Sequence, residues 1–209
     1  MIQIKGFRKS YHENVILDVP DLVIGKGVII FQGHNGSGKS TFLKAISGMI
    51  PFEGEVVLDN EYFLSKDPIL FRKWVNYSAA EPQYPDFISG KEIIDFYLKV
   101  KGGNKSEIEE YVKLLHVNSF YKNPIGSYSS GMLKKISLIS ALCGEPKILA
   151  LDELLTTIDV ESQHMFLEIL KQKVADGVSV FIASHHEIDQ NILPVNQYFK
   201  VQNQTITQL

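Results

Sequence analysis

The chain has 209 residues, of which 44% are hydrophobic and 22% charged, and its formal net charge is −3. This apolar content is too high, and this net charge too small, for an intrinsically disordered chain. The slight acidity gives no reason to expect a nucleic-acid partner. The single cysteine, Cys143, excludes an internal disulfide framework. The start carries no secretory signal pattern, and no stretch reaches the roughly 18–20 apolar residues needed to cross a bilayer.

The first 31 residues read as short strands with turn residues between them. The predicted strands are Ile2–Ile4, Val15–Val19, Leu22–Ile24 and Val28–Phe31. A Gly-rich loop follows the last strand, and a helix is expected from about Lys39 to Ile50, where glycine and proline would stop it.

The next segment is predicted to contain a strand, a short helix and another strand. Glu55–Leu58 and Trp74–Ala79 have the composition of strands. Between them, Asp67 can cap, and Pro68 can open, a short helix that runs through Lys73.

Residues from about 84 to 131 change character and are predicted to form a mostly helical insertion. Ser89 and Glu92 have the spacing of a capping box, which would open one helix. A second pattern of the same kind begins at Ser106 and would open another helix.

The last third of the chain alternates between helices and strands. Helices are predicted at Met132–Leu142 and Val160–Ala175, strands at Ile148–Leu151 and Val178–Ala183, and a terminal hairpin around Asn203. The alternation favours an α/β fold with a mainly parallel sheet and helices on its faces.

Residues 33–40 match the phosphate-loop pattern GxxxxGK[ST] in full. Glycines let backbone N–H groups turn toward phosphate oxygens, Lys39 reaches the β- and γ-phosphates, and Ser40 offers its hydroxyl to Mg²⁺. The motif predicts nucleotide binding but does not decide between a kinase, a GTPase and a transport ATPase. The predicted nucleotide-binding residues here are Gly33, His34, Asn35, Gly36, Ser37, Gly38, Lys39, Ser40 and Thr41.

The apolar segment 148–151 ends in two carboxylates, Asp152 and Glu153. At the carboxyl end of a parallel strand, both would lie beside the nucleotide crevice of an open α/β sheet. Asp152 is then placed to hold Mg²⁺, and Glu153 to polarise the attacking water.

Three further segments flank this acidic strand. Tyr128–Met132 precedes it, Leu154–Asp159 follows it, and Ser184-His185 comes after the next strand. Together with the phosphate loop, this order resembles the ATP-binding subunit of ABC transporters, with its LSGGQ signature, D-loop and histidine switch. The resemblance covers nearly the whole chain.

The resemblance implies a single domain over residues 1–209. The expected fold is a P-loop NTPase core of about 1–83 and 132–209, with an N-terminal antiparallel β subdomain and an inserted α-helical subdomain of about 84–131.

The resemblance also implies roles for individual residues. Ser129 and Gly131 match signature residues that touch the γ-phosphate bound by the opposite subunit, and Asp159 matches the D-loop aspartate at the dimer seam. His185 matches the histidine that holds the γ-phosphate and the attacking water, with His186 as the alternative. With Lys39 and Glu153, it completes the expected catalytic set.

Tyr11 stands where the family stacks an aromatic ring on adenine. The alternative interpretation of Tyr11 is a plain turn tyrosine.

The sequence departs from the family pattern at the signature and at the glutamine loop. The signature reads YSSGM, so that Ser130 replaces a glycine and Met132 a glutamine. Ala80 stands where the family has a glutamine that contacts Mg²⁺ and couples the site to the membrane partner. Glu81 and Gln83 are close enough to substitute, and Gln83 is the candidate for the metal set with Ser40 and Asp152.

The helical insertion is rich in aromatic residues. These are Tyr84, Phe87, Phe96, Tyr97 and Tyr111. Packing within the subdomain accounts for many of them, but the family receives a coupling helix of its membrane subunit in a groove beside this subdomain. Tyr84–Phe87 is the expected part of that groove.

The resulting functional prediction is an ATPase subunit that binds ATP with Mg²⁺. It would dimerise around two ATP molecules, as a homodimer or a heterodimer, and power a separate membrane-spanning transporter subunit. Export is favoured over import because the cassette is compact. The predicted location is cytoplasmic, on the inner face of the cell membrane.

Two alternatives belong to other classes. One is a nucleotide-gated binding module with weak hydrolysis, suggested by the altered signature and displaced glutamine. The other is a soluble ABC-type ATPase that acts on nucleic acid or ribosomes.

Overall fold

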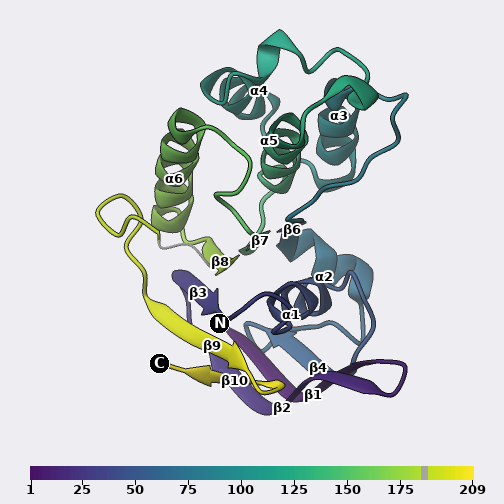
Figure 1. The fold of residues 1–209 in the computed structure, drawn as a ribbon, viewed down its shortest axis with the longest axis vertical. Coiled ribbons are helices and arrows are strands. Elements are labelled where there is room, and N and C mark those ends of the chain that lie inside the picture. The colour runs from purple at the N-terminus through teal and green to yellow at the C-terminus, as the bar shows by residue number, and fades with distance from the viewer. Residues whose placement is uncertain (185–187) are drawn as a thin grey trace.

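The computed structural model describes residues 1–184 and 188–209. Its central feature is a six-stranded sheet in the order β10-β9-β3-β8-β7-β6 (Figure 1). Five of these strands run parallel, and β10 pairs antiparallel with β9 at one edge. The strands are β3 (Val28–Gln32), β6 (Val75–Ser78), β7 (Ile148–Asp152), β8 (Ser179–Ala183), β9 (Gln197–Gln202) and β10 (Thr205–Gln208). The expected mainly parallel sheet and terminal hairpin are both confirmed.

A second, antiparallel sheet has the order β2-β1-β4-β5. Its strands are β1 (Ile2–Tyr11), β2 (Asn14–Ile24), β4 (Glu53–Leu58) and β5 (Tyr62–Phe63). The prediction of several short strands before residue 25 is wrong, because β2 continues through Pro20. Proline is tolerated there since β2 pairs only with β1 in this sheet and lies at its edge.

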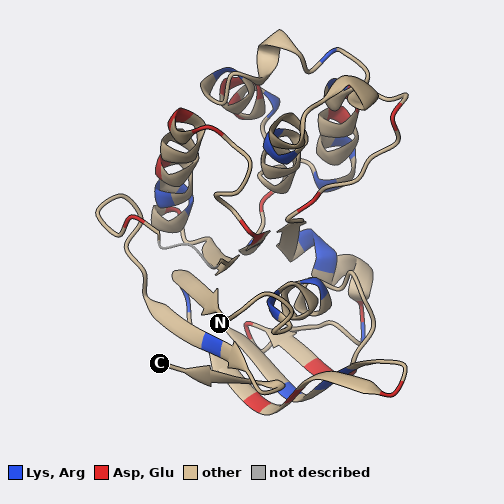
Figure 2. Cartoon of the chain, viewed as in Figure 1, with Lys and Arg blue, Asp and Glu red and all other residues tan. Residues whose placement is uncertain are grey.

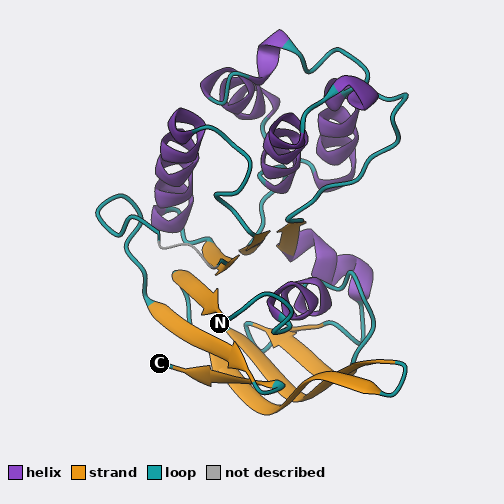
Figure 3. Cartoon of the chain, in the orientation of Figure 1, coloured by secondary structure: helices purple, strands orange, loops and turns teal. Residues whose placement is uncertain are grey.

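The α-helices are α1 (Lys39–Ile46), α2 (Pro68–Trp74), α3 (Gly90–Lys101), α4 (Lys105–Leu114), α5 (Ser130–Ala141) and α6 (Val160–Ala175). Four helices, α3 to α6, gather at the end of the molecule away from the antiparallel sheet, whereas α1 and α2 lie beside that sheet (Figure 3). Two short 3₁₀ turns, Val117–Ser119 and Ile125–Ser127, lie between α4 and α5. α6 has the predicted bounds, whereas α5 begins two residues before the predicted Met132.

The parallel sheet separates two hydrophobic cores. On β7, Leu149 and Leu151 belong to the core shared with α3–α6, whereas Ile148 and Ala150 belong to the core shared with α1 and the antiparallel sheet. This division follows from the strand period of two, which sends successive side chains to opposite faces. Strands buried on both faces need continuous apolar sequence, which explains why 148–151 is apolar throughout.

Helix caps follow the sequence in two places and depart from it in a third. Asp67 caps α2, and the capping box of Ser89 and Glu92 opens α3, as predicted. The second predicted capping box is wrong: Asn104 caps α4, and its side chain accepts hydrogen bonds from the backbone N–H groups of Ser106 and Glu107. Asparagine caps helices as well as serine does, and Asn104 lies two residues before the predicted cap, Ser106.

The first helix ends earlier than predicted. α1 stops at Ile46, and Gly48 has a φ of +71°, a left-handed conformation that favours glycine and ends the helix.

The C-terminal hairpin joins the two sheets. β9 pairs with β3 in parallel register, with Phe31 opposite Phe199. The backbone N–H of Asp18, in β2, donates a 2.7 Å hydrogen bond to the carbonyl of Gln204, in the hairpin turn. The hairpin therefore extends the parallel sheet and is hydrogen-bonded to the antiparallel one.

Charged residues are distributed over the whole fold. Figure 2 shows acidic and basic segments interspersed on helices and strands in this view. Within 1–184 and 188–209, no helix is both long and apolar enough to span a bilayer.

Candidate functional site

The predicted phosphate loop connects the end of β3 to the start of α1. The Lys39 ammonium is held inside this loop, donating hydrogen bonds to the carbonyls of Gly33 (2.8 Å) and His34 (3.2 Å). Its side chain is buried, so the cation points into the loop rather than into solvent. His34 and Asn35 lie exposed at the loop tip. This arrangement is that of a loop that encloses an anion.

Glycine is required at several points of the loop. Gly36 and Gly38 have φ values of +80° and +105°. A Cβ on Gly33 would lie 2.4 Å from the carbonyl oxygen of Val201 and 2.6 Å from Ser37 Oγ. The Ser37 hydroxyl is buried and has no hydrogen-bond partner among the described residues. A phosphate oxygen would satisfy this orphaned donor, so the loop fits the ligand that its sequence predicts.

Asp152 joins the loop to the end of β7. Its carboxylate accepts hydrogen bonds from Ser40 Oγ (2.9 Å) and from the Tyr77 hydroxyl (3.1 Å). Burial raises the pKa of Asp152, while these two hydrogen bonds and the positive charge of Lys134 oppose that rise. Burial and the neighbouring carboxylate of Asp152 raise the pKa of Tyr77, which keeps this phenol a donor. Ser40 and Asp152, the two residues predicted to hold Mg²⁺, are thus in direct contact.

A cavity of about 410 Å³ opens beside this pair. Its described lining residues are Ser40, Lys44, Ala79, Ala80, Glu81, Gln83 and Asp152. All three candidates for the glutamine-loop role therefore line the same cavity as the predicted metal ligands. Gln83 remains the predicted ligand, since an amide oxygen suits Mg²⁺ and the methyl group of Ala80 does not.

Glu153 follows β7 in a left-handed backbone conformation, with a φ of +47°. Its backbone N–H donates to the carbonyl of Ala183, and its carbonyl accepts from the hydroxyl of Thr156 at 2.9 Å. A non-glycine residue with positive φ is uncommon, and such conformations cluster at functional sites. The tight turn places Glu153 at the carboxyl edge of the sheet, beside Asp152.

The signature segment forms the N-terminus of α5. The exposed Ser129 caps the helix by accepting a 3.2 Å hydrogen bond from the Met132 backbone N–H. A Cβ on Gly131 would lie 2.4 Å from the carbonyl oxygen of Thr157. Gly131 is therefore where the signature helix meets the D-loop backbone, and no larger residue fits without a shift.

Asp159 ends the D-loop and caps α6. It accepts hydrogen bonds from the backbone N–H and the hydroxyl of Ser162. Its carboxylate also lies 2.7 Å from the Lys135 ammonium of α5. The hydrogen bond from Lys135 holds the pKa of Asp159 well below its ordinary value.

Two of the predicted roles stay predictions. Tyr11 is exposed at the end of β1, with the Lys9 ammonium 4.6 Å from its ring centroid, so the structure leaves its adenine-stacking role a prediction. His185 and the alternative His186 lie outside the described residues.

Three residues around the site were not predicted from the sequence: Tyr77, Lys134 and Lys135. Tyr77 lies in the short strand β6, where an aromatic residue needs no special explanation. The lysines did carry a signal, because they interrupt an otherwise apolar helix in which residues 134–141 are all buried. Buried lysines are rare unless they are paired.

A second cavity, of about 400 Å³, lies between α2, β6 and α3. Exposed apolar side chains on it are Met49, Ile69, Phe96 and Val100. Its basic residues are Arg72, Lys73 and Lys101, and its described lining includes no Asp or Glu. Figure 2 shows the basic stretch of α2. We call this cavity the α2–α3 groove.

Two buried polar atoms of the α2–α3 groove lack hydrogen-bond partners among the described residues. They are Ser47 Oγ and Asn76 Oδ1. Lys101 donates to the carbonyl of Arg72, and burial together with the Arg72 charge lowers the pKa of Lys101 to about 8. The groove thus combines apolar walls with uncompensated positive charge.

The predicted aromatic set divides between packing and exposure. Tyr111 is buried, and Tyr84 and Tyr97 pack against the helical core. Phe87 is 84% exposed and Phe96 60% exposed. Phe96 and Tyr97 line the α2–α3 groove, whereas its described lining includes none of residues 84–87.

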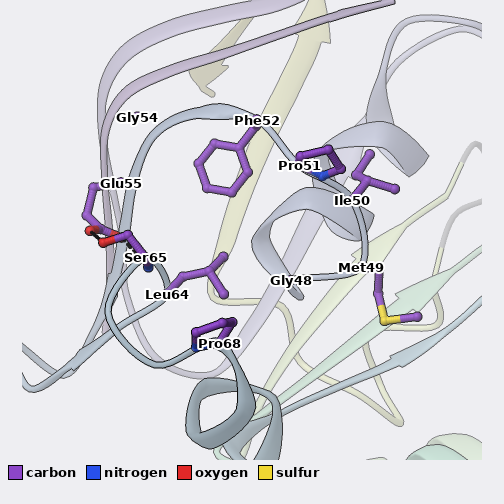
Figure 4. Close-up of a pocket in the computed structure, with 10 residues that line it drawn as sticks. All are labelled: Gly48, Met49, Ile50, Pro51, Phe52, Gly54, Glu55, Leu64, Ser65 and Pro68. Atoms are coloured by element: carbon purple, nitrogen blue, oxygen red, sulfur yellow. Dashed lines mark hydrogen bonds between the residues drawn. The ribbon is translucent and has the colours of Figure 1, made fainter.

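A further cavity, of about 280 Å³, lies between the end of α1 and the β4–β5 region (Figure 4). Phe52, Leu64 and Pro68 line it, and Glu55 and Ser65 lie together on one side, joined by a hydrogen bond. It shares no lining residue with the cavity at Asp152.

Comparison with known proteins identifies the family. Residues 21–156 match the family model described as ABC transporter. The chain is 31% identical over 195 residues to the uncharacterized ABC transporter ATP-binding protein YybJ of Bacillus subtilis, covering 90% of this chain and 87% of that protein. It is 26% identical to the linearmycin resistance ATP-binding protein LnrL of the same organism, covering 89% of this chain and 61% of LnrL. The chain therefore spans less than two thirds of some relatives it matches.

The fold agrees with these sequence matches. A solved structure described as a dimeric, post-hydrolysis ATP-binding cassette bound to ADP and Pi superposes with a TM-score of 0.84 at 21% identity. The alignment covers all of this chain and 98% of that one. With the phosphate loop and acidic strand in place, the chain belongs to the ABC transporter family, as one of its ATP-binding ATPase cassettes.

Proposed function

We propose that the chain is the subunit that dimerises around two ATP molecules and powers a separate membrane-spanning transporter subunit, in the direction of export. The hydrogen bond between Ser40 and Asp152 carries the proposal. It joins the phosphate loop to the acidic strand at the mouth of a cavity large enough for phosphate groups.

The phosphate loop binds the triphosphate of ATP. Backbone N–H groups and Lys39 surround the β- and γ-phosphates, and the Ser37 hydroxyl gains the acceptor that it lacks. Ser40, Asp152 and Gln83 would hold Mg²⁺, which neutralises phosphate charge when bound. Tyr11 supplies a surface for adenine.

Glu153 orients the attacking water for in-line displacement. It accepts a hydrogen bond from that water at the carboxyl edge of β7, next to Asp152. The proposed role of His185 is to hold the γ-phosphate and the same water. Lys39 offsets the negative charge that develops in the transition state.

Ser129 and Gly131 act on the ATP of the opposite subunit. Ser129 is exposed at the N-terminus of a twelve-residue helix, where free backbone N–H groups and the helix dipole favour a phosphate. Each γ-phosphate then contacts both copies, so ATP binding closes the dimer and hydrolysis releases it. Asp159 lies at the seam between the two.

The α2–α3 groove is the proposed docking site for the membrane-spanning partner. Its apolar walls fit one face of a short amphipathic helix. Arg72, Lys73 and Lys101 require that this helix also carry carboxylates, because the groove supplies no negative charge from its described residues. The buried Ser47 and Asn76 atoms offer it hydrogen bonds.

The proposed direction of transport is supported by the names of similar proteins. LnrL is named for linearmycin resistance, which is in keeping with export. A manganese transport system ATP-binding protein, MntB of Listeria innocua, is also similar at 28% identity, and its name states no direction.

A Glu153→Gln substitution tests the proposal. The variant should bind ATP, hydrolyse it at a rate reduced about 100-fold or more, and accumulate as a closed dimer. The measurements are phosphate release and size-exclusion chromatography with and without ATP. Near-normal turnover in the variant would exclude the role given to Glu153.

The wild-type chain separates the two alternatives in the same assays. Tight ATP binding without turnover identifies a nucleotide-gated binding module. Turnover stimulated by DNA or ribosomes, rather than by a co-purified membrane protein, identifies a soluble ATPase of the other class.

A further inference from the structure

Lys134 is a lysine with no exposed surface, and it begins the fully buried part of α5. Its ammonium donates 2.6 Å hydrogen bonds to the backbone carbonyls of Ala79 and Asp152. Burying an ammonium group is costly unless hydrogen bonds and nearby negative charge compensate. A leucine or methionine would fill the same space without that cost. The position of this cation therefore calls for a reason beyond packing.

The two carbonyls belong to different parts of the nucleotide site. Ala79 directly follows β6 and begins the loop that lines the cavity with Gln83. Asp152 is the last residue of β7 and contacts Ser40. Figure 1 shows α5 next to the ends of both strands. One side chain thus links the signature helix to the loop at residue 79 and to the predicted metal-binding strand.

The charge of Lys134 also matches its surroundings. Asp152 and Glu153 stabilise the ammonium form, although burial lowers the pKa of Lys134 to about 8. The adjacent lysine has other partners: Lys135 donates a hydrogen bond to the carbonyl of Leu115 and forms an ion pair with Asp159. Of the two, only Lys134 connects α5 to the carboxyl edge of the parallel sheet.

We propose that Lys134 is a positioning residue that couples the signature helix to the chain's own nucleotide site. When Ser129 and Gly131 engage the ATP of the opposite copy, α5 shifts, and Lys134 carries that shift to the loop at residue 79 and to Asp152. Each subunit then aligns its own site only when its signature is engaged. This role rests on the proposed function, because it presumes the composite dimer.

The test compares Lys134→Met, which keeps an unbranched apolar side chain but removes the donor, with Lys134→Gln, whose amide can donate to a carbonyl; both side chains are one atom shorter than lysine. Lys134→Met should lower kcat for ATP about 10- to 100-fold while KM for ATP stays within about two-fold of wild type. Lys134→Gln should have an intermediate kcat at the same KM. Lys173→Met, which removes a partly buried lysine bonded to Glu107 far from the site, is the matched control and should keep the wild-type kcat.

Three outcomes would overturn the role of Lys134. They are a wild-type kcat in Lys134→Met, a fall in kcat matched by a rise in KM, and a kcat in Lys134→Gln no higher than in Lys134→Met. If Lys134→Met does not fold, Lys134→Gln alone decides. A lowered kcat at constant KM supports the role, and a wild-type kcat refutes it.

Hydrogen exchange gives a readout that needs no turnover. Backbone amides of residues 79–83 should exchange faster in Lys134→Met than in wild type, whereas amides of β1 should not change. Unchanged exchange at 79–83 would refute the link. If the wild-type chain itself failed to hydrolyse ATP, the proposed function would fall, and this comparison would still decide whether Lys134 holds residues 79–83 in place.

Discussion

At the residue scale, close approach of backbones determines which side chains the site tolerates. Gly131 and Gly33 both sit where a single Cβ would come within 2.4 Å of a carbonyl oxygen. The phosphate motif alone predicts that Gly33 is needed, because the motif requires glycine at this position. Nothing in the sequence predicts that Gly131 touches Thr157, because that contact joins two segments that meet only in the folded chain.

Gly131→Ala tests this contact. The added Cβ must displace the Thr157 backbone, so the free energy of unfolding should fall by about 1–3 kcal/mol, and ATPase activity should fall with it. The measurements are denaturant unfolding and phosphate release. Ser130→Ala, at the exposed neighbouring position of the same helix, is the control. Equal stabilities of the two variants would contradict the steric argument.

At the element scale, α5 is the helix on which the site depends. Its N-terminus carries Ser129, and its two buried lysines reach β6, β7, the end of α4 and the start of α6. The 3.6-residue period predicts the helix, but it does not show which neighbours the lysines meet. The wrong prediction for the cap of α4 has a similar cause. Asn104 and Ser106 are both good N-cap residues, and the sequence does not show that the helix begins after Asn104.

The ion pair between α5 and α6 predicts a pH dependence. Asp159 has a pKa below its ordinary value of about 3.9, so its ionised form stabilises the folded chain. That contribution is complete above about pH 5 and is lost as the pH falls through the unfolded-state value toward the folded-state pKa. Asp159→Asn keeps an N-cap side chain but removes the charge. The free energy of unfolding of this variant should therefore fall further below that of the wild type at pH 6.5 than at pH 3.5.

A double-mutant cycle isolates the pair. Asp159→Asn, Lys135→Gln and the combined variant give a coupling energy at each pH. The expected coupling is favourable at pH 6.5 and smaller at pH 3.5. A coupling energy independent of pH would show that Lys135 is not the cause of the shifted titration.

At the scale of the whole molecule, the nucleotide site and the α2–α3 groove share β6. Tyr77, which contacts Asp152, is in β6 and also lines the groove. Sequence periodicity predicts β6 as a strand but cannot predict a groove between distant helices. The resemblance to the family predicts that residues 84–87 form part of the partner's groove, and this stays a prediction, while the cavity lined by α2 and α3 includes none of them in its described lining.

Two substitutions, one reversing a charge and one adding a charge, test the α2–α3 groove. Lys101→Glu and Phe96→Asp should each reduce co-purification with the membrane partner at least about ten-fold, since one removes the complementary cation and the other an exposed apolar contact. Val23→Asp, at an exposed apolar position on β2, is the control and should leave co-purification unchanged. If Lys101→Glu bound the partner as well as wild type, an acidic partner helix would be excluded.

The hairpin of β9 and β10 has a consequence for biosynthesis. The phosphate motif is complete by residue 40, yet the carbonyl of Val201 lies against Gly33, and β9 is the neighbour of β3. A nascent chain still lacking residues 197–208 would carry every nucleotide-binding residue of the loop without the strand that supports it. ATP affinity should therefore arise only after residues 197–208 have been synthesised and β9 has paired with β3.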